Sequence, residues 1–331
     1  MKMTGSVCRN QCLPKRFNFR NDLWSPAFAG DFFCMHIAVT FYEEFNFSCT
    51  FNHLQKIIVQ ENNIAISPLV SVAMATYNGA HFIREQLDSI IGQTYSPLEI
   101  IIVDDGSKDD TIAIIKEYQK KYSNINLYQN KTNTGVTKAF EKAISYCKGE
   151  FIALSDQDDI WELNKLEILL RSFDTEDAVY SNSQLVDDKG KSLGVKFDSL
   201  MNLQSYYSGD PFLMGNCIPG HTIVMKTGFA STLSPFPQHI MFDRWIGFCA
   251  AACNGIRYVD MPLVKYRQHD NNAIGTGRSN QKKKKSTAKE QFDVKLGELK
   301  AMTAAPIKNL STQKNFTRDD LSVHASLEFK A

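Results

Sequence analysis

The sequence predicts an α/β fold with a Rossmann-like, mostly parallel sheet and helices on both faces. From residue 69 to residue 181, apolar runs of strand length alternate with helical segments of about 12 residues. Two of these runs end abruptly in carboxylates, at Asp104-Asp105 and at Asp156-Gln157-Asp158. Strands that are covered on both faces have such continuous apolar runs, and their crossovers are right-handed. The alternation stops after Asp187, so we expect residues 187–240 to form a mixed region beside the sheet.

Turn residues and helical spacing set the expected elements. The turn Thr76-Tyr77-Asn78-Gly79 closes the first strand, because Asn-Gly readily supplies a positive φ. Ser107 followed by Asp110 predicts a capping box for the helix after the second strand. A helix is expected over residues 242–254 and a hairpin at residues 187–190. The expected strands cover residues 69–75, 98–103, 125–128, 151–154, 178–181, 256–259 and 263–267.

Composition narrows the class of protein. The chain has 331 residues, of which 43% are hydrophobic, so it can bury a sizeable core. Its net charge of +1 gives no sign of a nucleic-acid-binding surface. No apolar run reaches the ~18–20 residues that span a bilayer. The eight cysteines form no CxxC pair, which argues against a zinc ribbon and indicates a reducing, cytoplasmic location.

Three regions are expected along the chain. Residues 1–67 have no clear period and form an N-terminal extension of unknown role. Residues 68–275 form the organised domain. Residues 276–331 hold a basic linker, an amphipathic helix and a loose tail. The lysines at 282–285 and the helix after them fit peripheral contact with an anionic membrane, although a solvated linker and a helix packed on the domain are the preferred interpretation.

Several common catalytic motifs are absent from the sequence. There is no GxGxxG after the first strand, so dinucleotide binding of the NAD type has no support. Neither a P-loop, a GxSxG elbow nor an HExxH motif is present. The remaining chemistry lies in the two acidic strand ends, which a doubly wound sheet places at one edge.

The acidic strand ends predict a ligand site. Carboxylates as close as Asp156, Asp158 and Asp159 repel one another and are best tolerated in water or around Mg²⁺ or Mn²⁺. Such a cation can neutralise a departing diphosphate. Asp104 and Asp105 can bond a ribose hydroxyl or a base N–H. The alternatives are a solvated acidic loop after the fourth strand and a helix N-cap after the second.

Three segments resemble the family 2 glycosyltransferases in order and spacing. They are Val70–Gly79, Ile102–Ser107 and Ser155–Trp161. The resemblance covers roughly residues 68–275 and implies the GT-A fold, with the mixed region on the acceptor side. The form Asp-Gln-Asp-Asp-Ile-Trp resembles bacterial members described as rhamnosyl- or other surface-polysaccharide glycosyltransferases.

The resemblance implies a nucleotide pocket and a metal site. Thr76 and Tyr77 would line the nucleoside pocket, with Tyr77 stacking on the base. Asp104 would bond the uracil or thymine or its ribose, beside Asp105. Asp156 would complete the nucleotide site.

The implied metal site uses the second acidic strand end. Asp156 and Asp158 form the DxD pair around Mn²⁺ or Mg²⁺, with Asp158 as the direct ligand. Tyr266-Arg267-Gln268-His269 resembles a segment near the diphosphate and metal, which makes His269 a further metal ligand and Arg267 a site residue. His269 is alternatively a surface histidine. Trp161 is expected as a core residue or a pocket wall.

The resemblance also places the general base. Asp243 in Met241-Phe242-Asp243-Arg244-Trp245 stands where the family has this base, although Arg244 departs from the family pattern. Asp243 could instead cap its helix. Gly220-His221 resembles an acceptor-side loop.

The function implied is metal-dependent, inverting transfer of a sugar from a UDP- or dTDP-linked donor to a glycan or lipid-linked acceptor. The product would be a surface polysaccharide or lipopolysaccharide, made at the inner face of the plasma membrane. A nucleotidyltransferase would need a basic, Gly-rich loop after the first strand, which residues 76–81 do not supply. A catalytically silent sugar-nucleotide-binding or scaffold protein is the alternative from another class, and the intact Asp-x-Asp argues against it.

Overall fold

A computed structural model describes residues 67–269, 297, 298, 300 and 302. The compact unit that holds this fold begins at Ser67. The expected extension before it, the basic linker at 278–285 and the tail after Pro306 lie outside the described residues. In the part of the chain that is described, no helix is long and apolar enough to cross a membrane.

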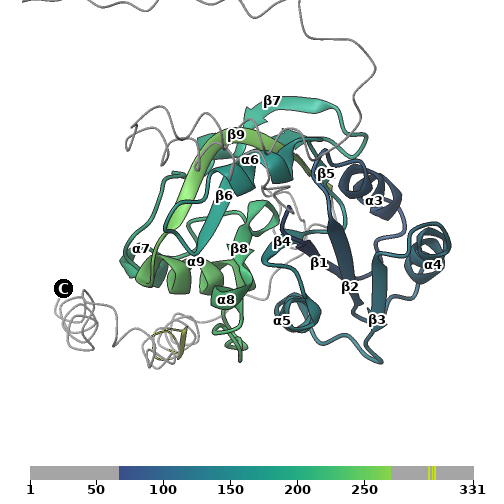
Figure 1. The fold of residues 1–331 in the computed structure, drawn as a ribbon, viewed down its shortest axis with the longest axis horizontal. Helices are drawn as coiled ribbons and strands as arrows, with labels where there is room; N and C mark the ends of the chain where they lie inside the picture. Colours follow the sequence, from purple (N-terminus) through teal and green to yellow (C-terminus); the bar gives the residue numbers. More distant parts are fainter. Residues whose placement is uncertain (1–66, 270–296, 299, 301, 303–331) are drawn as a thin grey trace, which may run out of the picture. The chain divides into compact units, whose positions relative to one another are not determined.

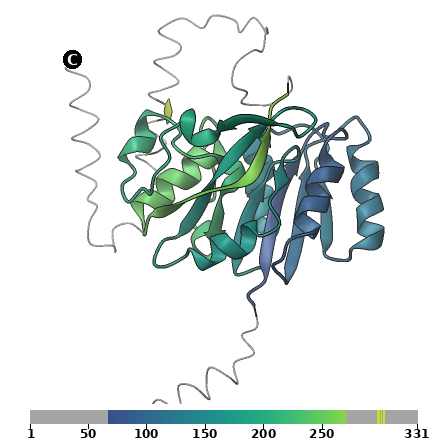
Figure 2. The same ribbon diagram turned by 90° about the horizontal axis from the view of Figure 1, so that it is seen from above.

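One nine-stranded sheet organises the domain, in the order β3-β2-β1-β4-β8-β6-β9-β5, with β7 paired to β6 (Figures 1 and 2). The first four strands are parallel to one another. Beyond β4 the sheet becomes mixed, because β8 runs antiparallel to both β4 and β6. The strands are β1 (Val70–Thr76), β2 (Leu98–Asp104), β3 (Ile125–Gln129), β4 (Phe151–Ser155), β5 (Ile160–Trp161), β6 (Ala178–Val186), β7 (Ser192–Lys196), β8 (Val224–Lys226) and β9 (Ile256–Arg267).

Helices cover both faces of this sheet, as the sequence predicted (Figure 1). Alternate residues of β1 enter two different buried clusters: Ala73 packs with Phe140 of α5, whereas Met74 packs with Leu87 of α3. This alternation is the period of two that a strand imposes on its side chains. The helices are α3 (Ile83–Ile91), α4 (Thr111–Lys121), α5 (Val136–Tyr146), α6 (Lys165–Arg171), α7 (Asp210–Met214), α8 (Thr227–Ala230) and α9 (Phe242–Ala252), with 3₁₀ turns η1 (Phe197–Ser199) and η2 (Gly220–Thr222).

Strand register brings the acidic strand ends together. Thr76 pairs with Asp104 across β1 and β2, and Met74 pairs with Ser155 across β1 and β4. Asp156 therefore follows β4 at the same edge where β1 and β2 end. The prediction that both acidic strand ends share one edge is confirmed.

Two expectations about local structure are wrong. The expected capping box does not form, because α4 begins at Thr111 and the Ser107 hydroxyl donates to Asp104 instead. Asp109, rather than Ser107, accepts the N–H of Thr111 at 3.1 Å. The two strands expected near the end of the domain are one strand, β9, whose register against β6 shifts where Asn182 meets Pro262.

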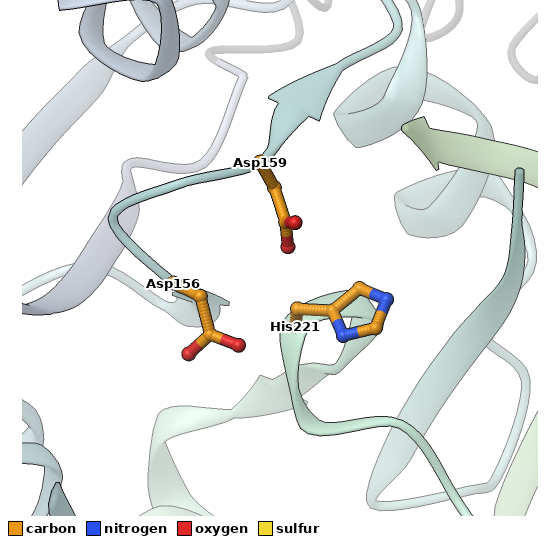
Figure 3. Close-up of side chains that lie close together, drawn as sticks. All are labelled: Asp156, Asp159 and His221. Carbon is orange, nitrogen blue, oxygen red and sulfur yellow. The ribbon is translucent and has the colours of Figure 1, made fainter. Parts of the chain in front are cut away.

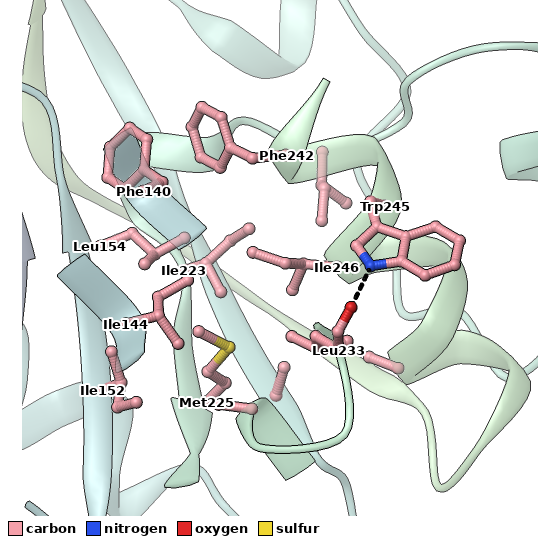
Figure 4. Close-up of a cluster of buried hydrophobic side chains, with 14 of the residues drawn as sticks. Phe140, Ile144, Ile152, Leu154, Ile223, Met225, Leu233, Phe242, Trp245 and Ile246 are labelled. Atoms are coloured by element: carbon pink, nitrogen blue, oxygen red, sulfur yellow. Dashed lines mark hydrogen bonds between the residues drawn. The ribbon is translucent and has the colours of Figure 1, made fainter. Parts of the chain in front are cut away.

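The region after β6 packs through α9. Trp245 is buried, and its indole N–H donates to the Leu233 carbonyl at 2.9 Å, so it is a core residue (Figure 4). Arg244 forms a 2.6 Å ion pair with Glu298, and Met302 is fully buried in the same core. The contacts of Glu298 and Met302 fit a helix that packs on the domain, which was the alternative to membrane contact; membrane contact stays a prediction.

Candidate active site

A cavity of 420 Å³ lies at the shared strand edge. One side is formed by residues that follow β1, β2 and β4, and the other by η1, η2 and the start of α9. Ligand sites of open α/β sheets lie in this position, outside the carboxyl ends of the strands. The predicted site residues that line it are Thr76, Tyr77, Asp105, Asp156, Asp158, His221 and Asp243.

Asp104 organises the loops behind the cavity. Its carboxylate is fully buried and accepts hydrogen bonds from the Thr76 hydroxyl at 3.0 Å and from Ser107 through both its N–H, at 2.9 Å, and its hydroxyl. Asp104 is not part of the cavity lining. The structure thus gives it a supporting position, and Asp105 is the acid of this pair that reaches the wall.

Asp105 is held as a carboxylate by several donors. Thr134 and Gly135 donate backbone N–H groups at 2.9 and 2.8 Å, and Asn130 donates its side-chain amide at 2.8 Å. Burial alone would raise the pKa of Asp105, but these hydrogen bonds outweigh burial and lower the pKa. Asp105 therefore fixes the start of α5 at the edge of the cavity.

Gln157 ties β1 to the loop after β4. Its amide accepts the Tyr77 N–H at 2.9 Å and donates to the Tyr77 carbonyl at 3.1 Å. A Cβ on Gly79 would lie 2.2 Å from the Gln157 oxygen, so glycine permits this close approach. The Tyr77 ring is left 44% exposed at the cavity, in a position suited to stacking.

Two of the three residues predicted as metal ligands, Asp158 and His269, lie in contact. His269 Nε2 lies 3.0 Å from Asp158 Oδ2, although 111 positions separate them in sequence. Deeper in, ligand atoms of Asp156, Asp159 and His221 lie within 4.8 Å of one another (Figure 3).

The electrostatics of this cluster favour a cation. Burial, with repulsion from Asp158, raises the pKa of both Asp156 and Asp159. In the described part of the chain, Asp159 Oδ2 is buried without a hydrogen-bond partner. Burial lowers the pKa of His221 to about 3, so its imidazole is neutral and can act as a ligand. Carboxylate oxygens and neutral imidazoles suit a divalent cation, and the residues present fit one, although the buried Lys165 already offsets part of the repulsion between Asp156 and Asp159.

Asp243 lies across the cavity, in the first turn of α9. Its Oδ2 accepts the Asn216 amide at 2.7 Å, and its Oδ1 accepts the N–H of Arg244 at 2.8 Å. Burial raises the pKa of Asp243 to about 6 despite these donors. The Arg244 side chain points elsewhere, donating to the Phe212 and Leu213 carbonyls at 2.8 and 2.9 Å. Arg244 thus anchors α9 and leaves Asp243 on the cavity wall.

Arg267 and Trp161 support the site without lining the cavity. Arg267 is buried and donates to the Asp158 carbonyl at 2.8 Å, the Asp188 carbonyl at 2.6 Å and the Glu85 carboxylate. Trp161 is buried in the core under α6. The Arg267 side chain thus fixes the loop that carries the DxD pair.

Three residues around the site were not predicted as site residues. Asp159 was visible as a third acid, but its burial was not. Asn216 lies in the region without clear sequence pattern, and no signal singles it out. Lys165 reads as an ordinary helix residue, yet it is fully buried beside the acidic cluster.

The chain belongs to the glycosyl transferase family 2, whose sequence model matches residues 71–234. An uncharacterized glycosyltransferase of Rickettsia typhi is 32% identical over 219 residues, which cover 63% of this chain and 67% of the relative. Escherichia coli WfgD, a UDP-Glc:alpha-D-GlcNAc-diphosphoundecaprenol beta-1,3-glucosyltransferase, is 40% identical over 100 residues, covering 30% of this chain and 39% of WfgD.

Solved structures agree on the fold. TarS of Staphylococcus aureus, residues 1–349 in complex with UDP-GlcNAc, has a TM-score of 0.56 at 18% identity, over 76% of this chain and 69% of that one. The GT-A-like fold class is thereby confirmed.

Some relatives are much longer than this chain: the match covers only 34% of an uncharacterized glycosyltransferase of Rickettsia felis.

Asp105→Asn tests the carboxylate contacts at the wall. The variant replaces one acceptor oxygen with an NH₂ donor that faces backbone N–H groups. We therefore expect the free energy of unfolding at pH 7 to fall by about 1–3 kcal/mol. The pKa of Asp105 is lower in the folded state than its ordinary value of 3.8. The ionised carboxylate therefore stabilises the folded state fully above about pH 3.8, and this stabilisation is lost as pH falls below that value.

Urea unfolding at pH 7 and pH 3 measures this difference. Asp110→Asn is the control, since Asp110 is exposed and its side chain makes no capping bond. An equal penalty for Asp105→Asn at both pH values contradicts the assignment.

Proposed function

We propose that the protein transfers a sugar from a nucleotide-diphosphate donor to an acceptor hydroxyl with inversion at the anomeric carbon. The observation that carries the proposal is a buried carboxylate, Asp243, on the wall opposite the acidic strand ends at Asp156 and Asp158. A single cavity thus offers a base on one side and a site for a diphosphate–metal group on the other.

The donor side is assigned to the strand edge. Tyr77 is exposed for stacking on a base, with Thr76 behind it and Asp105 beside it. Asp104 is assigned to holding Thr76 and the β2 loop. UDP-linked donors are the first choice, because WfgD is named for UDP-Glc and TarS was solved with UDP-GlcNAc; dTDP-linked donors remain in the prediction.

The metal is assigned to the DxD segment. Asp158 and His269 would hold Mn²⁺ or Mg²⁺, with Asp156 beside them. The bound cation would neutralise charge on the departing diphosphate. Arg267 would keep the Asp158 backbone in place through its 2.8 Å hydrogen bond.

Asp243 is assigned as the general base. A base works best when its pKa lies near the operating pH, and the pKa of Asp243 is raised to about 6. Asn216 fixes one carboxylate oxygen, which orients the group toward the acceptor side. The acceptor hydroxyl would pass its proton to Asp243 as it attacks the anomeric carbon.

The acceptor half of the cavity is largely apolar. Leu200, Met201 and Met241 line it, and Leu200 is 51% exposed. Such a wall suits an acceptor with an apolar or lipid-linked part. A surface polysaccharide or lipopolysaccharide intermediate at the inner membrane face is the acceptor class we propose. The cytoplasmic location stays a prediction.

A donor panel tests the proposal. Binding and turnover of UDP-, dTDP- and GDP-sugars are measured with and without Mn²⁺ or Mg²⁺, using wild type, Asp243→Asn and Asp210→Asn. We expect one donor class to bind, and Asp243→Asn to lower transfer about 10²–10⁴-fold while donor affinity is kept. Asp210 is exposed at the start of α7, and Asp210→Asn is the control that should bind donor and transfer sugar like wild type. If no donor binds under any condition, the protein is a scaffold protein rather than an enzyme.

The pH dependence of kcat reports the base. Asp243 must be ionised to accept a proton, so kcat should fall as pH drops through about 6. Asn216→Ala removes a hydrogen bond that lowers the pKa of Asp243, and the acidic limb should move to higher pH.

Ser234→Ala is the matched control, because it removes a side-chain hydrogen bond to the carboxylate of Glu141, away from this cavity. Its pH profile should equal that of wild type. An acidic limb that does not move in Asn216→Ala assigns the titration to another group.

A further inference from the structure

Lys165 is a buried charged residue that the mechanism above does not use. It is the first residue of α6, its exposed fraction is 0%, and it does not line the cavity. Burying a lysine is costly unless specific partners hold it. Its partners therefore indicate what the residue contributes.

The Lys165 nitrogen has two close partners. It donates to the His221 carbonyl at 2.9 Å and lies 3.5 Å from the centroid of the Trp161 ring. Burial lowers the pKa of Lys165 well below its usual value, although the nearby carboxylates of Asp159 and Asp156 oppose this shift. A lysine nitrogen donates a hydrogen bond whether or not it is charged, so the bond to His221 does not depend on that balance.

The partner carbonyl belongs to the η2 turn, Gly220–Thr222. On its other side this turn faces Asp243, the proposed base. A Cβ on Gly220 would lie 2.9 Å from Asp243 Cβ and 2.8 Å from the Phe242 ring. The turn is thus packed directly against the first turn of α9.

A continuous set of contacts therefore runs from α6 to the base. It passes from Lys165 to the His221 carbonyl, through the turn to Gly220, and on to Asp243, against which Gly220 packs. The ring of His221 is fixed separately, with Nε2 3.1 Å from the Ser183 hydroxyl. Lys165 thus acts on the backbone of the turn, and Ser183 acts on the ring.

We propose that Lys165 is a positioning residue that holds the η2 turn so that Asp243 faces the donor edge of the cavity. The inference rests on the proposed role of Asp243 as general base. Lys165 does not touch the reacting groups. It joins the element after the DxD loop to the wall that carries the base, and so keeps the two halves of the site at one spacing.

Lys165→Met removes the donor and keeps a long, apolar side chain. Misplacing a reacting group by about 1 Å can cost about 10²-fold in rate, so kcat should fall about 10²-fold. The Kd for uridine should stay within about threefold of wild type, because the nucleoside wall at Tyr77 and Asp105 shares no partner with Lys165. A purely destabilising change would weaken both.

A double-mutant cycle with Asp243→Asn gives the sharper readout. If Lys165 acts through the base, Lys165→Met should lower the residual activity of Asp243→Asn by less than about threefold. An equal loss of about 10²-fold in both backgrounds would falsify the proposal. If Lys165→Met does not fold, Lys165→Leu, which also removes the donor, replaces it, with the same two results deciding.

Lys226 provides a matched control. Its nitrogen also donates to a backbone carbonyl, that of Thr175 at 3.3 Å, and lies over an aromatic ring, that of Phe173, but it is not at the cavity. Lys226→Met should keep kcat. If the wild-type protein has no transfer activity, the proposed function itself is wrong. If wild type is active and Lys165→Met has the same kcat, only this inference is wrong.

Discussion

The crowding of carboxylates at one edge of the sheet is the constraint on which this structure depends. Asp156, Asp158 and Asp159 follow a single strand, and Asp243 approaches from the opposite wall. Burial and mutual repulsion make several of these groups hard to ionise together. A divalent cation would relieve that repulsion, and a nucleotide diphosphate would in turn be held by the cation. Binding of metal and binding of donor are therefore expected to be coupled.

The fold holds this crowded arrangement with contacts that do not themselves touch a substrate. The parallel register of β1, β2 and β4 aligns the strand ends. Arg267, reaching back from the end of β9, fixes the loop of Asp158. Gln157 bonds that loop to Tyr77 after β1, and Lys165, the first residue of the following helix α6, bonds to the η2 turn. Because a packed core deforms little, these contacts are expected to fix the spacing between the proposed donor site and Asp243, the proposed base.

Sequence reasoning predicted the parallel half of the sheet well, because each strand there is a local apolar run with its own turn signal. It also predicted the shared acidic edge, which follows from parallel topology alone. It could not assign Arg267 or Asn216 their partners, since Arg267 meets a residue 109 positions away and Asn216 one 27 positions away through tertiary folding. The burial of Lys165 was hidden for the same reason: a helix pattern gives no sign of which partner accepts a lysine. The capping box failed because Ser107 has a stronger acceptor in Asp104.

The coupling between cation and nucleotide is the most direct test of the account. Calorimetric titration of UDP into the protein at pH 7.5, with and without Mn²⁺, measures it for wild type, Asp158→Asn and the surface control Glu117→Gln. We expect Mn²⁺ to strengthen UDP binding at least about tenfold in wild type and in the control, and Asp158→Asn to lose this gain. Equal UDP affinity with and without Mn²⁺ in wild type would contradict the central claim that the acidic edge binds the donor through a cation.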